Sequence, residues 1–105
     1  TWGISKVIGG MSQPLGGYLA DVAAFRAEVG APVIHAGRVA DLSTAAHAVD
    51  SGAADLVGMT RAHMADPHIV QKLTAKTPER IRPCVGASYC IDRIYAGRAA
   101  FCLHN

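Results

Sequence analysis

Two apolar segments that each end in an arginine constrain the fold of this chain more than any other feature. Residues 32–38 (PVIHAGR) and 55–61 (DLVGMTR) contain the short apolar runs expected of buried strands. Each segment is followed within a few residues by an aspartate that can begin a helix, Asp41 after the first and Asp66 after the second. Repeated strand–helix units of this kind predict an α/β architecture in which parallel strands are joined by helices.

The remaining elements fit the same alternating order. Residues 5–8 form a short apolar run before two glycines, and we expect them to end a further strand. Residues 56–59 are almost continuously apolar, which is typical of a parallel strand buried on both faces. Apolar spacing, caps and breakers predict helices over about residues 19–27, 42–51, 67–75 and 89–95.

The two arginines are expected to lie together, because the carboxyl ends of parallel strands share one rim of a sheet. Arg38 and Arg61 would bind phosphate oxygens bidentately there, beside helix N-termini that carry partial positive charge. Gly37 would let the backbone approach a ligand closely, and Thr60 would add a hydroxyl donor. In a (β/α)8 barrel the loops after the last two strands are the usual phosphate site. The alternative is that each arginine pairs with an aspartate at the rim.

A cysteine-bearing segment follows the second arginine and predicts a metal centre. Cys84, Cys90 and Cys102 are close enough in sequence to share one site, and thiolates favour iron–sulfur clusters or zinc. A usual cubane takes four cysteines, and Ala87 stands where a Cys-x-x-Cys-x-x-Cys run would place its middle ligand. His104 would complete a zinc site of three cysteines and one histidine, although the cysteine spacing is unusual for zinc. Buried thiols that act as small hydrophobic side chains are the remaining alternative.

Charge, length and cysteine usage narrow the class of protein. The formal net charge of +2 is small and the basic residues are scattered, which does not favour nucleic acid. No apolar stretch approaches the roughly 18 residues of a membrane span. The 3 cysteines are an odd number confined to the last quarter of the sequence, which favours ligands over disulfides and a reducing cytoplasm. At 105 residues the chain is far shorter than a closed barrel of about 250, so we expect a fragment of a longer enzyme.

Three stretches together resemble a known family. Residues 32–38, 55–67 (DLVGMTRAHMADP) and 82–105 (RPCVGASYCIDRIYAGRAAFCLHN) resemble the old yellow enzyme, or NADH:flavin oxidoreductase, superfamily. The more similar part is its iron–sulfur branch, which includes trimethylamine dehydrogenase and 2,4-dienoyl-CoA reductase. The arginine pair alone is only moderately specific, whereas its combination with the Ala-Asp-Pro turn and the cysteine segment is highly specific.

The resemblance implies a TIM barrel that holds FMN. Residues 1–78 would form the last βα units of that barrel, and residues 79–105 would form a cysteine-bearing cluster arm. The residues that match the family's phosphate-binding positions are Gly37, Arg38, Thr60 and Arg61.

The same resemblance implies an iron–sulfur cluster and a redox activity. Cys84, Cys90 and Cys102 match three of the four ligands of a [4Fe–4S] cluster that exchanges electrons with the flavin. Ala87 departs from the family's second cysteine. Residues 84–95 are most similar in sequence to family members that oxidatively demethylate N-methylated amines and amino acids. The family also includes enzymes that act on enoyl-type substrates.

The partners that the resemblance implies are a small-molecule substrate, the flavin, and NAD(P)H or an electron-transfer flavoprotein. The rest of the barrel, or another copy of the chain, would cover unpaired strand edges. Substrate-contacting residues of the family normally lie on earlier strands, outside this sequence. The alternative function is a non-redox barrel enzyme that binds sugar phosphates, of the aldolase or isomerase type, which explains the arginines but not the cysteines.

Overall fold

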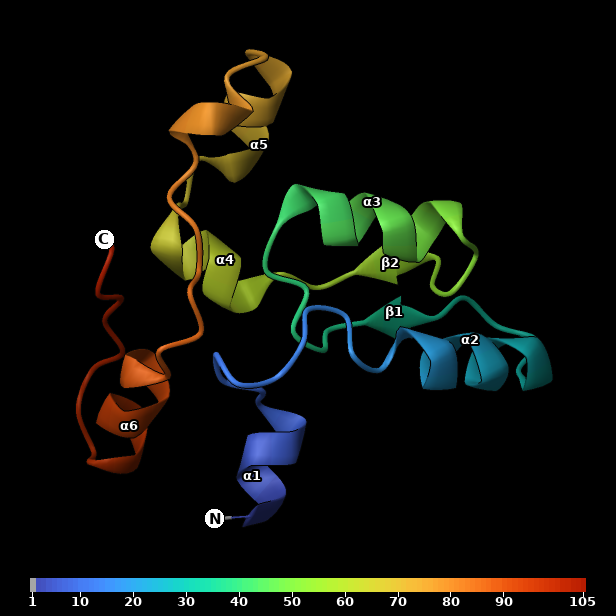
Figure 1. The fold of residues 1–105 in the computed structure, drawn as a ribbon, viewed down its shortest axis with the longest axis horizontal. Coiled ribbons are helices and arrows are strands. Elements are labelled where there is room, and N and C mark those ends of the chain that lie inside the picture. The colour runs from blue at the N-terminus through green and yellow to red at the C-terminus, as the bar shows by residue number, and fades with distance from the viewer. Residues whose placement is uncertain (1) are drawn as a thin grey trace.

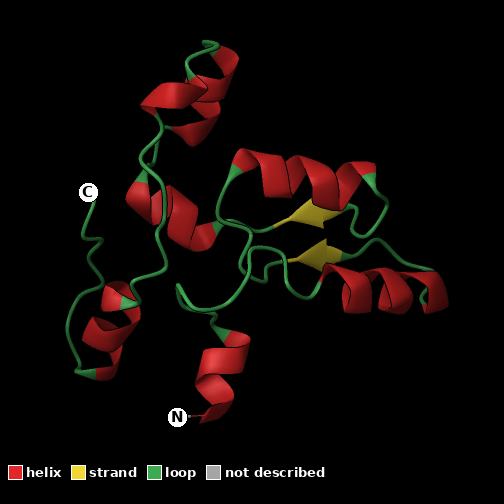
Figure 2. Cartoon of the chain, viewed as in Figure 1, coloured by secondary structure: helices red, strands yellow, loops and turns green. Residues whose placement is uncertain are grey.

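A computed structural model of the protein describes residues 2–105 and shows a two-stranded parallel sheet with helices around it (Figure 1). In chain order the elements are α1 (Trp2–Val7), α2 (Leu19–Glu28), β1 (Ile34–His35), α3 (Leu42–Asp50), β2 (Leu56–Val57), α4 (Thr60–Ala65), α5 (Ile69–Thr74), a 3₁₀ turn (Pro78–Arg80) and α6 (Tyr89–Tyr95). Loops join these short elements along most of the chain (Figure 2).

The two strands confirm the predicted parallel α/β arrangement. Ile34 lies beside Leu56 and His35 beside Val57 in a parallel register. The backbone N–H of Gly58 donates to the carbonyl of His35 at 2.8 Å, which continues the ladder past the end of β2. Helix α3 connects the strands and packs on β2. Both predicted strand segments therefore exist, although each strand covers only two residues.

Helix α3 begins and ends as its sequence predicts. The carboxylate of Asp41 accepts a hydrogen bond from the backbone N–H of Thr44 at 2.7 Å, which caps the first turn. Gly52 follows the helix with φ at +74°, a left-handed conformation that glycine adopts without strain. Helix α6 likewise spans the predicted residues, Tyr89–Tyr95.

The expected strand at residues 5–8 is wrong, because this run lies in and directly after helix α1. The backbone N–H of Ile8 donates to the carbonyl of Ile4 at 2.7 Å, so the run satisfies its polar groups locally. A strand needs a neighbouring strand for the same purpose, and the described chain places none beside this segment.

The prediction that the apolar strand at residues 56–59 is buried on both faces is also wrong. Leu56 is 56% exposed and its register partner Ile34 is 68% exposed. Side chains alternate between the two faces of a sheet, and α3 covers only one of them in the described chain. The apolar face of the sheet that carries Ile34 and Leu56 therefore lies open.

The second arginine does not lie at the end of a strand as predicted. Strand β2 ends at Val57, and Thr60 and Arg61 form the first turn of α4, an additional helix that the sequence pattern did not show. The next helix, α5, begins at Ile69 rather than at the predicted Pro67. Helix α4 runs to Ala65, and Pro67 and His68 belong to the turn between α4 and α5.

An ion pair ties α2 to the start of β2. The guanidinium of Arg26 donates to both carboxylate oxygens of Asp55, at 2.9 and 2.7 Å. The backbone N–H of Val33 donates to the same carboxylate at 2.8 Å. These bonds, that of Arg26 first, lower the pKa of Asp55 to about 2. Arg26 also donates to the carbonyl of Gly52 at 3.1 Å, so one side chain fixes the segment between α3 and β2.

Small side chains form the buried part of the described chain. The buried apolar residues are Val33, Val39, Ala48, Ala53, Ala54, Ala62, Ala65 and Ile69. Alanine allows helices and strands to approach closely but buries little apolar area per residue. None of the described helices has the length and apolar character that crossing a membrane requires.

Candidate functional site

The two predicted arginines lie at one cavity beside the carboxyl end of the sheet. Arg38, Thr60 and Arg61 line this cavity together with Gly58 and Cys84. We call it the rim cavity. Arg38 reaches it from the loop after β1 and Arg61 from the first turn of α4. The structure therefore brings together three of the four predicted phosphate-binding residues, although only the first arginine comes from a strand-end loop.

Each arginine carries a buried nitrogen without a partner. Nη1 of Arg38 and Nη1 of Arg61 are both buried and have no hydrogen-bond partner among the described residues. Leaving a buried donor unsatisfied costs about 1–3 kcal/mol, and more for a charged group. Both arginines line one cavity, so an anion bound there would supply acceptors for the two donors.

The alternative of rim ion pairs is wrong, because the nearby aspartates have other partners. Asp41 caps α3. Asp66 pairs with the ammonium group of Lys72. Neither carboxylate contacts Arg38 or Arg61 in the hydrogen bonds and ion pairs of the described chain. Both guanidinium groups therefore bring positive charge to the rim cavity without a carboxylate partner.

Arg38 is held by backbone groups. Its own φ is +54°, a left-handed conformation that is rare for a residue with a side chain. Its Nε–H donates to the carbonyl of Gln13 at 3.4 Å. A Cβ placed at Gly86 would lie 2.6 Å from both terminal nitrogens of this guanidinium, so the side chain rests directly on the glycine backbone. The sequence pattern showed neither Gln13 nor Gly86, since both lie far from Arg38 along the chain.

Gly37 is needed for packing against its neighbour. A Cβ at Gly37 would lie 2.5 Å from Cε1 and 2.7 Å from Nε2 of His35, so the imidazole ring fills the space that a side chain would take. Nε2 of His35 is itself buried without a partner in the described chain, which differs from the hydrogen-bonded core position usual for a strand histidine.

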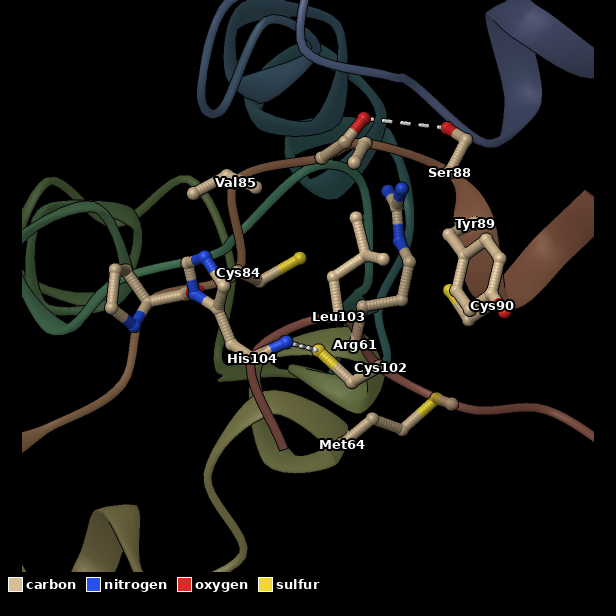
Figure 3. Close-up of a pocket in the computed structure, with 13 residues that line it drawn as sticks. Arg61, Met64, Cys84, Val85, Ser88, Tyr89, Cys90, Cys102, Leu103 and His104 are labelled. Atoms are coloured by element: carbon tan, nitrogen blue, oxygen red, sulfur yellow. Dashed lines mark hydrogen bonds between the residues drawn. The ribbon is translucent and has the colours of Figure 1, made fainter.

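A second cavity, which we call the thiol pocket, contains the three predicted cysteines. Cys84, Cys90 and Cys102 line it with Arg61 and His104 (Figure 3). All three cysteines are free thiols of intermediate exposure. The structure thus brings the three predicted ligands together around one pocket.

The thiol pocket is not arranged as a site for one metal ion. Within residues 2–105, no group of three or more His, Cys, Asp or Glu side chains is positioned to hold an ion. A zinc–sulfur bond of about 2.3 Å would require sulfur atoms about 4 Å apart. The imidazole Nδ1–H of His104 donates to the carbonyl of Pro83 at 2.8 Å. Ala87 also lines the pocket and offers no ligand atom, so the candidate donors there are the three thiols and Nε2 of His104.

Asp66 connects the end of α4 to the start of the cysteine segment. Its carboxylate is fully buried and accepts hydrogen bonds from the ammonium group of Lys72 and the backbone N–H groups of Arg82 and His68, the latter two at 2.9 and 3.0 Å. These donors, Lys72 first, hold the pKa of Asp66 well below its usual range. Because Asp66 directly follows α4 and Arg82 begins the cysteine segment, this carboxylate joins the end of α4 to the start of that segment.

The last residues of the chain lie beside α4 and the thiol pocket. The side-chain amide of Asn105 donates to the carbonyl of Met64 in α4 at 3.1 Å. The guanidinium of Arg93 in α6 donates to the carbonyl of Ala99 at 2.7 Å and lies 4.6 Å from the ring centre of Phe101. These contacts fold the segment after α6 back and place Cys102 in the thiol pocket.

The fold and the two cavities define a class of protein. Parallel βα units with arginines near the carboxyl end of the strands are typical of α/β proteins that bind phosphate groups. The chain belongs to the NADH:flavin oxidoreductase / NADH oxidase family, whose model matches residues 5–80. This membership confirms the resemblance and favours a flavin enzyme over a non-redox sugar-phosphate barrel.

Two curated relatives have similar sequences. The chain is 60% identical over 80 residues to the probable N-methylproline demethylase of Rhizobium meliloti (strain 1021), covering 76% of this chain and 12% of the relative. It is 45% identical over 102 residues to the N,N-dimethylglycine/sarcosine dehydrogenase of Chromohalobacter salexigens, covering 97% of this chain and 15% of the relative. The chain therefore spans less than a sixth of the length of these relatives.

A solved structure shows the same arrangement of elements. The chain matches 2-naphthoyl-CoA reductase, solved in complex with 2-naphthoyl-CoA, with a TM-score of 0.83 and 26% identity. The match covers 91% of this chain and 15% of that one. The roles of the arginines and cysteines stay predictions that rest on the geometry described above.

Proposed function

We propose that this chain forms the cofactor-binding section of an FMN-dependent oxidoreductase, as the C-terminal portion of a (β/α)8 barrel followed by a cysteine-bearing arm. The observation that carries the proposal is the pair of buried, unpartnered Nη1 atoms of Arg38 and Arg61 at one cavity. A flavin mononucleotide ends in a phosphate dianion, which supplies the missing acceptors. Riboflavin, which lacks the phosphate, would leave both donors unsatisfied.

The residues of the rim cavity have distinct tasks in this proposal. Arg38 and Arg61 donate charge-assisted hydrogen bonds to phosphate oxygens and neutralise their charge. Thr60 lines the same cavity and adds a hydroxyl donor. When it is bound, the flavin supplies hydride exchange with the substrate, and the protein supplies its binding and orientation.

The thiol pocket is proposed as the site of an iron–sulfur cluster held by three cysteines. Cys84, Cys90 and Cys102 surround one pocket without closing on a single ion, as expected when ligands are separated by the width of a cluster. Ala87 leaves one corner of a [4Fe–4S] cubane without a protein thiolate. Such a cluster supplies single-electron transfer beside the flavin site.

Oxidative demethylation of small N-methylated amino acids is the proposed reaction of the whole protein. The names of two relatives refer to N-methylproline and to N,N-dimethylglycine or sarcosine. Reduction of an activated alkene is the second candidate, because a third relative, from Caballeronia cordobensis, is a multifunctional alkene reductase/demethylase, 46% identical over 96 residues. NAD(P)H or an electron-transfer flavoprotein would exchange the electrons, in the cytoplasm.

The proposal is tested on the full-length protein purified without oxygen. Released cofactor is identified by chromatography, and the protein is then mixed with N-methylproline, with sarcosine, or with an activated alkene after prior reduction. We expect the released cofactor to be FMN, and we expect the N-methylated amino acids to reduce the bound flavin and remove its visible absorbance. Bound FAD, or no flavin, would overturn the phosphate site. FMN that only the alkene reoxidises would favour the second candidate.

A further inference from the structure

Gly86 in the cysteine segment lies against the guanidinium of Arg38. Gly86 is buried and has φ at +73°. A Cβ at this position would lie 2.6 Å from Nη1, 2.6 Å from Nη2 and 2.7 Å from Cζ of Arg38, closer than real Cβ atoms approach such groups. The guanidinium therefore rests on a surface that only a glycine backbone leaves free.

The same stretch of backbone meets the loop after α1. A Cβ at Gly10 would lie 3.3 Å from Oγ of Ser88 and 3.5 Å from the carbonyl oxygen of Gly86. The loop after α1 also supplies the carbonyl of Gln13, which accepts the Nε–H of Arg38. Arg38 is thus held between two backbone segments, one of which also carries the cysteines.

We propose that Gly86 is a positioning residue of the flavin phosphate site, so that the cysteine segment forms one wall of that site. The backbone of residues 84–88 holds the Arg38 guanidinium in the position from which it lines the rim cavity. This inference rests on the proposed function, since it names what positions one of the two phosphate ligands.

The rim cavity and the thiol pocket also share lining residues. Arg61 and Cys84 each line both the rim cavity and the thiol pocket. A phosphate that orders the two guanidinium groups therefore also orders the backbone that carries Cys84. Because linkage is reciprocal, the conformation of the cysteine segment in turn sets the affinity for the phosphate.

A matched pair of glycine variants tests the proposal in the full-length protein. Gly97 also has a positive φ, +70°, but no atom of residues 2–105 lies within 4 Å of a Cβ placed there. Gly86→Ala and Gly97→Ala therefore introduce similar backbone strain, and only the first displaces Arg38. We expect Gly86→Ala to weaken FMN binding by about tenfold or more, the loss of one charge-assisted hydrogen bond. Riboflavin binding should stay unchanged, and Gly97→Ala should leave both affinities unchanged.

The outcomes separate this inference from the proposed function. A wild-type protein that takes up no FMN would overturn both. Wild-type FMN binding with equal FMN affinities for the two glycine variants would overturn the positioning role alone, as would an equal loss of FMN and riboflavin in Gly86→Ala. In an Arg38→Ala background, adding Gly86→Ala should cause no further loss of FMN.

Hydrogen exchange on the wild type decides the matter if Gly86→Ala fails to fold. Backbone amides of residues 84–90 should exchange more slowly with saturating FMN than with saturating riboflavin. Equal exchange with the two flavins would show that the phosphate does not order the cysteine segment, and would overturn the inference.

Discussion

Replacing Arg61 with alanine in the full-length protein should weaken FMN binding while leaving riboflavin binding unchanged. Arg61 lies in the first turn of α4 and lines the rim cavity, and its Nη1 is buried without a partner among the described residues. An FMN phosphate would satisfy that donor, whereas riboflavin has no group that reaches it. The two flavins share the same ring, so their difference isolates the phosphate contact.

The size of the effect follows from the kind of bond that is lost. A hydrogen bond to a charged group contributes about 1.5–3 kcal/mol. At about 1.4 kcal/mol per factor of ten, the dissociation constant of FMN should rise about 10- to 150-fold. Arg61→Lys should recover part of this loss, because an ammonium group keeps the charge but lacks the planar fork of donors.

The stability of the flavin-free protein gives an independent check. Truncation of Arg61 removes packing by its aliphatic stem, but it also removes a buried donor that has no acceptor. These two effects oppose each other, so the thermal midpoint without flavin should change little. The matched control is Arg98→Ala, which removes an equal charge from an exposed residue after α6.

Fluorescence titration of flavin-free protein with FMN and with riboflavin measures both affinities. The reasoning is refuted if Arg61→Ala loses affinity for the two flavins equally, or if Arg98→Ala weakens FMN as much as Arg61→Ala does. A large fall in the thermal midpoint of flavin-free Arg61→Ala would show that the guanidinium has a structural partner instead.

Three further changes test the fold and the thiol pocket. Arg26 and the Val33 N–H lower the pKa of Asp55 to about 2. The stabilisation that the Asp55 carboxylate provides is therefore complete above the ordinary pKa of 3.8 and is lost as the pH falls toward 2. Asp55→Asn should lower the thermal midpoint at neutral pH and reduce the decline of the midpoint in acid. Asp41→Ala removes the cap of α3 and should cost about 1 kcal/mol in urea denaturation, whereas Asp41→Asn should keep most of it. Cys90→Ser should lower the iron and acid-labile sulfide of anaerobically purified protein, and an unchanged iron content would show that these thiols are not ligands.

The parts of the fold that the sequence predicts are those with local signals. The helix over Leu42–Asp50 has its cap and its terminating glycine within the same dozen residues, and the structure places it as expected. The two arginines meet because parallel strands share a rim, which is a rule of topology and needs no knowledge of side-chain contacts. Their convergence was therefore predictable even though Arg61 lies in a helix.

The missed parts depend on partners that lie far away along the chain. Asp66 before a proline indicates a helix start, but nothing nearby shows that its carboxylate accepts the N–H of Arg82 and so positions the cysteine segment. Gly86 looks like an ordinary loop glycine until the guanidinium of Arg38 is placed beside it. The apolar run at residues 56–59 predicts burial, yet burial also needs a covering layer that the described chain does not provide for Leu56.

A crystal structure of the full-length protein with FMN tests the central claim most directly. The account predicts that the phosphate lies at the rim cavity within hydrogen-bond distance of Nη1 of both Arg38 and Arg61, with the Arg38 guanidinium still resting on Gly86. A phosphate bound elsewhere, with the two arginines paired to carboxylates from other parts of the protein, would contradict it.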